Sequence, residues 1–329
     1  MSIQILPTEI LLLIFRFVGN KELAQNCGVA VCQRWHSIIK SILVKDIRVS
    51  GPQFIKISDR DFQYMKIFTR ALEINMTIKL PPYEIDKAYD ELADDRRRLR
   101  RLKQHPKLVQ KRLNHLSTLI PDYSSLRSLV LRFGRVGDAE DERQFPTCGG
   151  WDQVSFIKGL WSTRLAHLTI ETGQIGYPRQ KGVCRMIAQI IPSLISVRLQ
   201  LRWICDELLD FTHIDATEPP PRIKNIIISD IMHYIVDSDW YWEYSMHEWD
   251  MNCSYHTLFV QLENKAEEAV RRLPTLEGLW IVKHEGRWAR SVTSREFVTR
   301  IERTYPIEPS DVDGYDWTMP TPWIETIAF

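Results

Sequence analysis

Residues 1–48 place apolar residues at the spacing of α-helices. One apolar stripe is predicted to follow a helix that begins near Pro7, a residue suited to a first helical turn, and ends at Gly19. A second helix is predicted near Lys21, and a third from Val31 onward. The apolar members of these helices are Ile10, Leu11, Leu12, Leu13, Ile14, Phe15, Val18, Trp35, Ile38 and Ile39. So short a segment cannot bury this surface by itself, so a second polypeptide is expected to cover part of it.

Beyond residue 48 the apolar pattern changes to a triplet of the form Leu-x-x-Leu-x-Leu. In its last three positions apolar residues alternate with others, which predicts a short, half-buried strand. Copies begin at residues 126, 165, 194, 223 and 276, with steps of 39, 29, 29 and 53 residues, and a weaker copy occupies residues 69–74. Helices are predicted at 151–162, 180–191 and 257–273. This pattern predicts an α/β domain over residues 49–305, in which short parallel strands stack over a shared core.

One insertion, at residues 84–119, is predicted to be helical and to be broken at Pro106. Its segment 96–112 holds nine basic residues and no acidic one. Such a run is most often a solvated helix face. The open alternatives are a nuclear-import signal or a phosphate-binding patch.

A second insertion, at residues 237–251, is acidic and rich in aromatic residues. It either packs onto the neighbouring repeat or binds a basic segment of a protein substrate through ion pairs and aromatic faces. The candidate substrate contacts are Trp240, Tyr241, Trp242, Tyr244 and Trp249. The tail, residues 306–329, is predicted to form an irregular cap.

Composition narrows the class of protein. The 329 residues are 44% hydrophobic and 26% charged, with a formal net charge of +1, which gives no overall field for nucleic acid or anionic membrane. Six scattered cysteines predict reduced thiols, and hence a cytoplasmic or nuclear protein. No apolar run is long enough to span a bilayer, so a soluble protein is expected.

Candidate chemistry is sparse along the chain. Cys253-x-x-His256 lies near His233 and His247, but the spacing is irregular and no second cysteine pair completes a tetrahedral set, so no metal site is predicted. Nucleotide-binding glycine motifs and common hydrolase motifs are absent from the sequence. We expect neither a cofactor nor catalysis.

Three pieces of the N-terminal segment together resemble an F-box: Leu6-Pro7-x-Glu9-Ile10, Ile14-Phe15 and Val31-Cys32-x-Arg34-Trp35. The interval between Leu23 and Val31 is longer than the usual pattern. The downstream triplets resemble the leucine-rich-repeat-like substrate domains of fungal F-box proteins, without the asparagine that usually follows each strand. The fold class expected is therefore α/β, with a small three-helix F-box followed by an irregular solenoid of short parallel strands and helices.

The resemblance implies a partner and a function. An F-box docks on a Skp-family adaptor, and through it on a cullin, and the downstream domain then holds a protein substrate for ubiquitin transfer by other subunits. By motif position, the adaptor contacts are Leu6, Pro7, Ile10, Ile14, Phe15, Val31, Cys32 and Trp35, whereas Leu13, Val29 and Ile39 are expected to pack inward. The resemblance thus implies a non-catalytic substrate receptor of an SCF-type E3 ubiquitin ligase. The alternatives are a scaffold that uses the F-box only for assembly and, third, an enzyme with an unfamiliar active site.

Overall fold

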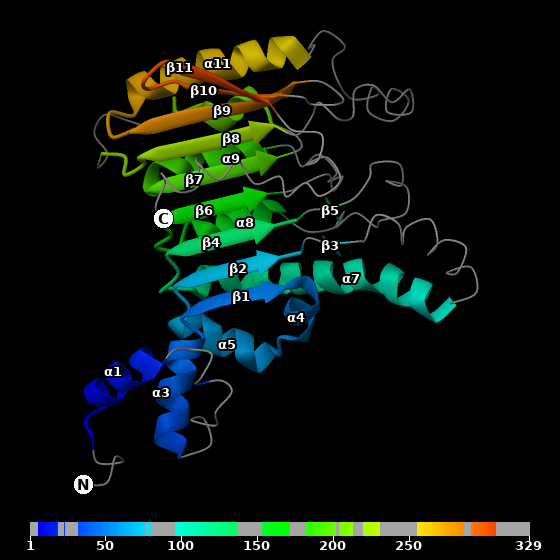
Figure 1. Ribbon diagram of the computed structural model, residues 1–329, viewed down its shortest axis with the longest axis vertical. Helices are drawn as coiled ribbons and strands as arrows, with labels where there is room; N and C mark the ends of the chain where they lie inside the picture. Colours follow the sequence, from blue (N-terminus) through cyan, green and yellow to red (C-terminus); the bar gives the residue numbers. More distant parts are fainter. Residues whose placement is uncertain are drawn as a thin grey trace.

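The computed structural model presents an α/β protein with a small helical module at one end of a large sheet (Figure 1). It describes residues 6–18, 23, 32–76, 78–79, 96–133, 135–136, 153–171, 182–201, 204–212, 220–230, 255–285 and 291–306. All structural statements below concern these residues.

The large sheet is mostly parallel. Its nine strands lie in the order β1-β2-β4-β6-β7-β8-β9-β10-β11, parallel as far as β9, and the last two strands run antiparallel to their neighbours. The strands are β1 (Asp46–Ser50), β2 (Ala71–Asn75), β4 (Ser128–Arg132), β6 (His167–Glu171), β7 (Ser196–Leu201), β8 (Asn225–Asp230), β9 (Gly278–Glu285), β10 (Ser291–Glu296) and β11 (Ile301–Pro306). Two short strands, β3 (Ile78–Lys79) and β5 (Arg135–Val136), pair separately.

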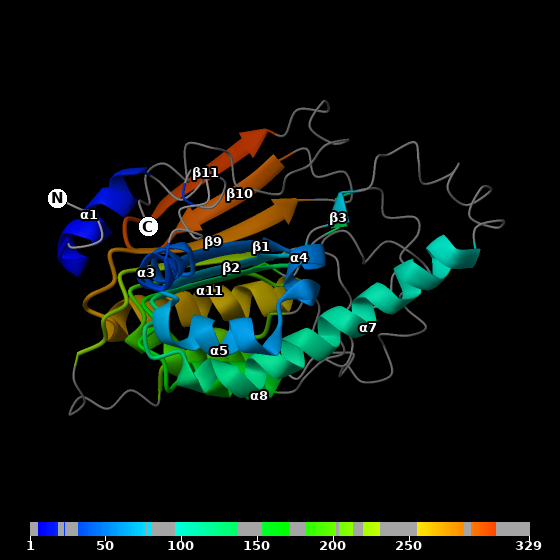
Figure 2. The same ribbon diagram turned by 90° about the horizontal axis from the view of Figure 1, so that it is seen from below.

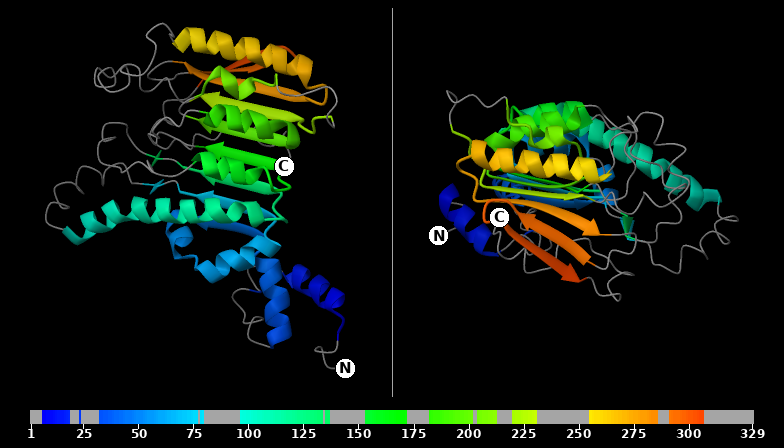
Figure 3. Two further views of the ribbon diagram at one scale, coloured as in Figure 1. Left: turned by 180° about the vertical axis from the view of Figure 1, so that it is seen from behind. Right: turned by 90° about the horizontal axis from the view of Figure 1, so that it is seen from above.

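Two helices, α1 and α3, precede the first strand, and the later helices connect successive strands. The bounds of all described helices follow. They are α1 (Thr8–Val18), α3 (Gln33–Leu43), α4 (Gly51–Lys56), α5 (Asp59–Phe68), α7 (Arg96–Leu119), α8 (Gln153–Leu160), α9 (Val183–Ile190) and α11 (Tyr255–Arg272), with the 3₁₀ turns η3 (Ile120–Asp122), η5 (Ile191–Ser193) and η6 (Asp206–Leu209). Helices α7, α8, α9 and α11 lie on the same face of the sheet (Figures 2 and 3). The helices predicted at 151–162, 180–191 and 257–273 are confirmed as α8, α9 and α11.

The predicted strands pair in the register that the triplets require. The middle apolar residues form one row across the sheet, and the last ones form a second row beside it. The rows are Leu72, Leu129, Leu168, Val197, Ile226, Leu279 and Ile74, Leu131, Ile170, Leu199, Ile228, Ile281. All twelve side chains are buried in one continuous core, although the sequence steps between strands are unequal.

A second regularity lies along the edge at which the strands begin. The carbonyl oxygen of Lys45 accepts hydrogen bonds from the amides of Arg70 and Ala71, at 2.7 and 3.1 Å. The same doubly accepting arrangement repeats at Arg70, Arg127, Ala166, Ile195 and Lys224. Each of these carbonyls accepts from the first amide of the next strand in the sheet and from the amide just before it. Backbone groups therefore satisfy one another at the strand starts, without help from side chains in these bonds.

Helix α7 differs from the prediction at Pro106. The helix is continuous from Arg96 to Leu119, so Pro106 removes one amide donor without ending it. The first part of α7 projects away from the sheet, and its second half packs against α4, α5 and α8 (Figures 1 and 2).

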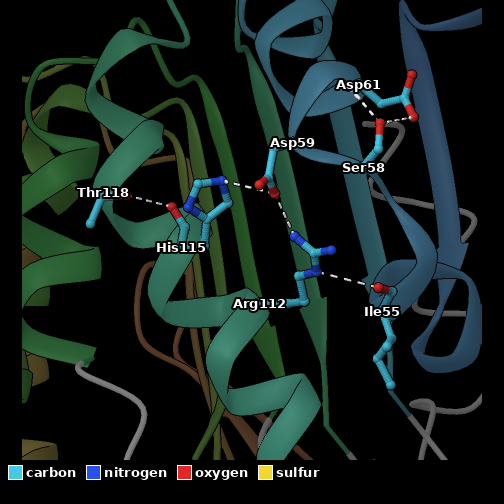
Figure 4. Close-up of polar contacts among 7 residues, drawn as sticks. All are labelled: Ile55, Ser58, Asp59, Asp61, Arg112, His115 and Thr118. Carbon is cyan, nitrogen blue, oxygen red and sulfur yellow. Dashed lines mark hydrogen bonds and ion pairs between the residues drawn. The ribbon is translucent and has the colours of Figure 1, made fainter.

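A polar cluster holds α7 against α5 (Figure 4). Arg112 Nη1 lies 2.7 Å from Asp59 Oδ1, and its Nε donates to the Ile55 carbonyl oxygen at 3.3 Å. His115 Nε2 lies 3.6 Å from the same Asp59 oxygen. The hydrogen bond from Arg112 holds the pKa of the exposed Asp59 carboxyl below its ordinary value.

Candidate functional site

The N-terminal module has a core of its own. Buried side chains from α1 and α3, together with Leu23 between them in the chain, form a cluster separate from the core beneath the sheet: Leu11, Phe15, Leu23, Ile38 and Ile39. Of the second predicted helix the structure describes only Leu23, in helical conformation. Because this core is small, its faces away from α3 cannot all be covered by the module itself.

Motif residues at the start of α3 position α1. The guanidinium of Arg34 donates to the Leu6 carbonyl oxygen at 2.8 Å and to Thr8 Oγ1 at 3.1 Å, and so fixes the beginning of α1. Cys32 caps α3, since its Sγ accepts a hydrogen bond from the Trp35 amide at 3.5 Å. The Trp35 ring meets Phe15 edge-on, with 4.9 Å between ring centroids. These contacts hold α1 and α3 in place, so the role that the structure gives to Arg34, Cys32 and Trp35 is structural.

The outer side of α1 is an uncovered apolar stripe. Ile10, Leu13 and Phe17 lie at helical spacing on the side away from the buried Leu11 and Phe15, and they are 42%, 60% and 95% exposed. Val18 extends the stripe and is also exposed. A contiguous run of exposed apolar side chains along one side of a helix is typical of an interaction surface.

The predicted adaptor contacts differ in how far their side chains are exposed to solvent. Pro7 and Ile10 are exposed, and Leu6, Ile14, Cys32 and Trp35 are half-buried. Phe15 is only 3% exposed and belongs to the core of the module. Val31 and Val29 lie outside the described residues.

Two further expectations concern residues said to pack inward. Ile39 is buried, as predicted. The prediction for Leu13 is wrong, because Leu13 points outward with Ile10 and Phe17. Sequence reasoning missed Leu13 and Phe17 because every position from Ile10 to Phe15 is apolar, and only the place of α3 decides which side faces inward.

A short joint connects the module to the sheet. Helix α3 ends at Leu43, and β1 begins three residues later at Asp46. The buried Thr69 donates through Oγ1 to the Val44 carbonyl oxygen at 2.9 Å, and Lys45 supplies the first of the doubly accepting carbonyls. The joint is therefore held by hydrogen bonds to two successive backbone carbonyls, and those to Lys45 continue the pattern of the sheet.

A hollow lies at the same joint, with a volume of about 290 Å³. It is lined from both sides, by Leu12, Ser41, Ile42, Lys45, Asp46, Phe68 and Arg70. The lining contains apolar, basic and acidic groups, so it does not point to one class of ligand.

A ladder of alternating charges crosses the face of the sheet opposite the helices. Arg48, Glu73, Arg132, Glu171 and Arg198 come from β1, β2, β4, β6 and β7 in turn. Successive ion pairs measure 3.3, 2.6, 3.0 and 3.3 Å. We call these five residues the charge ladder. It begins at an 86% exposed arginine, Arg48, and becomes more enclosed toward the centre of the sheet, where the Glu171 side chain is 13% exposed.

His167 lies on the same face, at the start of β6. Its Nδ1 is 2.8 Å from Ser196 Oγ, and burial lowers the pKa of the imidazole from 6.5, which leaves the ring neutral at pH 7. The charge ladder itself carries three arginines against two glutamates.

Several predicted features fall outside the described residues. These are the candidate substrate contacts Trp240, Tyr241, Trp242, Tyr244 and Trp249, the residues Cys253, His233 and His247 considered as metal ligands, and the tail 307–329. The insertion at 237–251 follows β8 in the chain and precedes α11. In the described part of the chain, no three His, Cys, Asp or Glu residues gather as a metal-ligand group. Among the described helices, none has the length and apolarity needed to cross a bilayer.

Comparison with known families bears on the helical module. The model of the F-box-like family matches residues 3–49, the segment that contains α1, α3 and most of β1. The chain therefore carries an F-box-like domain at its N-terminal end. A comparison with curated proteins finds no match to the chain.

Proposed function

We propose that this chain is the substrate-recognition subunit of an SCF-type E3 ubiquitin ligase. The observation that carries the proposal is the bare stripe of Ile10, Leu13 and Phe17 within a segment that matches the F-box-like family. F-box domains in general bind Skp-family adaptors, so the adaptor is the partner that this stripe fits. Full burial of side chains of this size is worth about 1.5–3 kcal/mol each, so a few of them suffice for a tight interface.

The role of the chain is proximity rather than catalysis. In such a complex other subunits transfer ubiquitin, and this chain fixes the substrate near the loaded enzyme. The hydrogen-bonded joint at Val44 and Lys45 supports this role, because it gives the sheet a defined orientation relative to the docking helix.

We also propose that residues 49–305 form an irregular leucine-rich-repeat-like solenoid. Two features support it: the apolar rows in register despite unequal steps, and the doubly accepting carbonyl at six successive positions. An experimental structure in which β6, β7 and β8 are not neighbours would contradict this description.

Substrate contact is assigned to two places. The charge ladder offers fixed charges of both signs on the sheet face without helices. The aromatic insertion remains the predicted second contact, through Trp240, Tyr241, Trp242, Tyr244 and Trp249. Replacing Trp240, Trp242 and Trp249 by alanine is expected to lose co-purifying substrate while adaptor binding persists; an unchanged set of co-purifying proteins would remove the insertion from the assignment.

The proposal is tested in cells by comparing the full chain with its Leu13→Ser/Phe17→Ser variant. We expect the wild type to co-purify a Skp-family adaptor and a cullin, and the variant to lose both. Proteins bound by both forms are substrate candidates, and their half-lives should lengthen when only the variant is present. Adaptor binding without cullin, with unchanged half-lives, would instead identify an assembly scaffold.

A further inference from the structure

The first half of α7 stands apart from the sheet. From Val109 onward the helix is anchored, because Val109, Leu113 and Leu116 are buried in the core beneath the sheet. The earlier part, residues 96–107, extends past the ends of the strands (Figures 1 and 2). At 1.5 Å per residue it is about 18 Å long. We call residues 96–107 the arm.

Basic residues dominate the arm, and it has no acidic residue. Seven of its positions are arginine or lysine: Arg96, Arg97, Arg98, Arg100, Arg101, Lys103 and Lys107. The whole chain has 43 basic and 42 acidic residues, so the part outside the arm has 36 basic and 42 acidic residues. The small net charge of the protein therefore conceals a strongly positive arm on an acidic body.

These charges oppose the helix that carries them. Helix α7 contains no acidic residue along its whole length, so no acid within the helix can pair with the arm. Basic residues recur instead at a spacing of three and four, where like charges repel one another: Arg97, Arg100, Lys103 and Lys107. The first of them also lie at the positive end of the helix dipole, which disfavours cations. A pattern that weakens its own helix and adds nothing to the core indicates a binding role, and an anionic partner relieves both repulsions.

The distribution of charge around the helix limits the shape of that partner. At 100° per residue the seven basic positions spread over about 220° of the circumference. The remaining arc holds Leu99, Leu102 and Pro106, in line with the buried Val109 and Leu113. A helix that lies on a membrane combines one basic side with a broad apolar side, which two leucines do not supply. A groove, in contrast, presents charge to both sides of a helix at once.

Duplex DNA is the polyanion whose shape matches the arm. Its major groove, about 12 Å wide, admits an α-helix between two rows of phosphates. Five of the seven basic residues are arginines, which bind phosphate oxygens through two parallel N–H donors. Single strands fit less well, because base stacking needs aromatic side chains and the arm contains no Phe, Tyr or Trp. Duplex RNA fits less well because its major groove is narrow and deep.

We propose that the arm binds the phosphate groups of duplex DNA, with its helix in the major groove. Because the contacts are to phosphates, binding is expected to be independent of base sequence. The arm belongs to a different element from the apolar stripe of α1, so DNA binding does not require the adaptor. This inference and the proposed ligase role can therefore fail separately.

The experiment titrates the purified full chain into a fluorescent duplex of about 20 base pairs and follows anisotropy between about 50 and 200 mM potassium chloride. We expect the logarithm of the binding constant to fall against the logarithm of salt concentration with a slope of about −4 to −6, since each neutralised phosphate contributes about −0.9. Arg97→Gln/Arg100→Gln/Arg101→Gln should bind at least about 10-fold more weakly, with a slope smaller in magnitude by about 3. Glutamine is a good helix former, so helicity by circular dichroism should not fall.

The matched control is Lys56→Gln/Arg60→Gln/Lys158→Gln, which removes the same three charges from exposed positions of α4, α5 and α8. It should bind the duplex as the wild type does. Vesicles of phosphatidylcholine with about 30% phosphatidylserine provide an anionic surface without a groove, and the chain should bind them more weakly than the duplex at equal phosphate concentration. Absence of duplex binding at low salt, equal losses in the two triple variants, or tighter binding to the vesicles would overturn the proposal.

Discussion

Lys40 of α3 lies over the ring of Tyr64 in α5, with its Nζ 4.2 Å from the ring centroid. The same ammonium is 3.9 Å from Asp61 Oδ1. One side chain of the F-box-like module thus contacts two residues on the first helix pair of the sheet domain. Together with the hydrogen bonds to the carbonyl oxygens of Val44 and Lys45, this contact defines how α3 is oriented relative to the sheet.

We predict that Lys40→Met lowers the melting temperature by about 2–4 °C, the effect of about 1 kcal/mol in a domain of this size. The loss is modest because the ion pair is partly in water, and the cation–π contact supplies most of the effect. Lys56→Met, at an exposed position of α4, is the matched control and should leave melting unchanged. An equal shift in the two variants would mean that the contact does not hold the joint.

The charge ladder leads to a second prediction. Arg132 lies between Glu73 and Glu171, at 2.6 and 3.0 Å, so Arg132→Met leaves two partly enclosed carboxylates without that cation. We expect the free energy of unfolding in urea to fall by about 1–3 kcal/mol. Arg48→Met removes an exposed arginine from the same ladder and should cost less than about 0.5 kcal/mol. Equal losses for Arg48 and Arg132 would show that enclosure toward the sheet centre is unimportant.

The contact between Asp59 and Arg112 gives a prediction about pH. Because the folded-state pKa of Asp59 lies below its ordinary value of 3.8, the ionised carboxylate stabilises the fold at neutral pH. This contribution is lost as the pH falls through the folded pKa, where the carboxyl is protonated in both states. We therefore expect Asp59→Asn to melt lower than the wild type at pH 6, and the difference to shrink below pH 4. A difference that stays constant across this range would argue against the Arg112 contact as its source.

The sheet could be predicted from the sequence because its strands and its core depend on the same alternation. In the triplets, positions such as Leu129 and Leu131 face the helices, so apolar spacing alone locates the strand. Strand β1 carries the same alternation, with Ile47 and Val49 half-buried between Asp46, Arg48 and Ser50, although it was not predicted. Strands β10 and β11 were missed because polar residues follow one another along each strand, at 293–295 in β10 and at 302–304 in β11.

The candidate site could be located by sequence but not resolved into its two sides. Helix α1 is apolar over most of its length, so the spacing does not say which residues α3 covers. The structure assigns Phe15 to the core and Leu13 to the surface, and it gives Arg34 a role at the beginning of α1 that no local pattern contains.

The central claim is that the outer side of α1 is a docking surface for a Skp-family adaptor. The most direct test is the dissociation constant of the purified full chain and the purified adaptor, with Leu13→Ala/Phe17→Ala compared with the wild type. These side chains are exposed in the isolated chain, so their truncation should leave the fold intact, as judged by an unchanged melting temperature. Ile67→Ala, at a position of α5 that is as exposed as Leu13, is the control for loss of a surface apolar group.

We predict that the wild type and Ile67→Ala bind the adaptor equally, and that the double variant binds at least about 100-fold more weakly, since it loses about 3 kcal/mol of apolar burial. Equal affinity of all three proteins, or no binding by the wild type, would contradict the account.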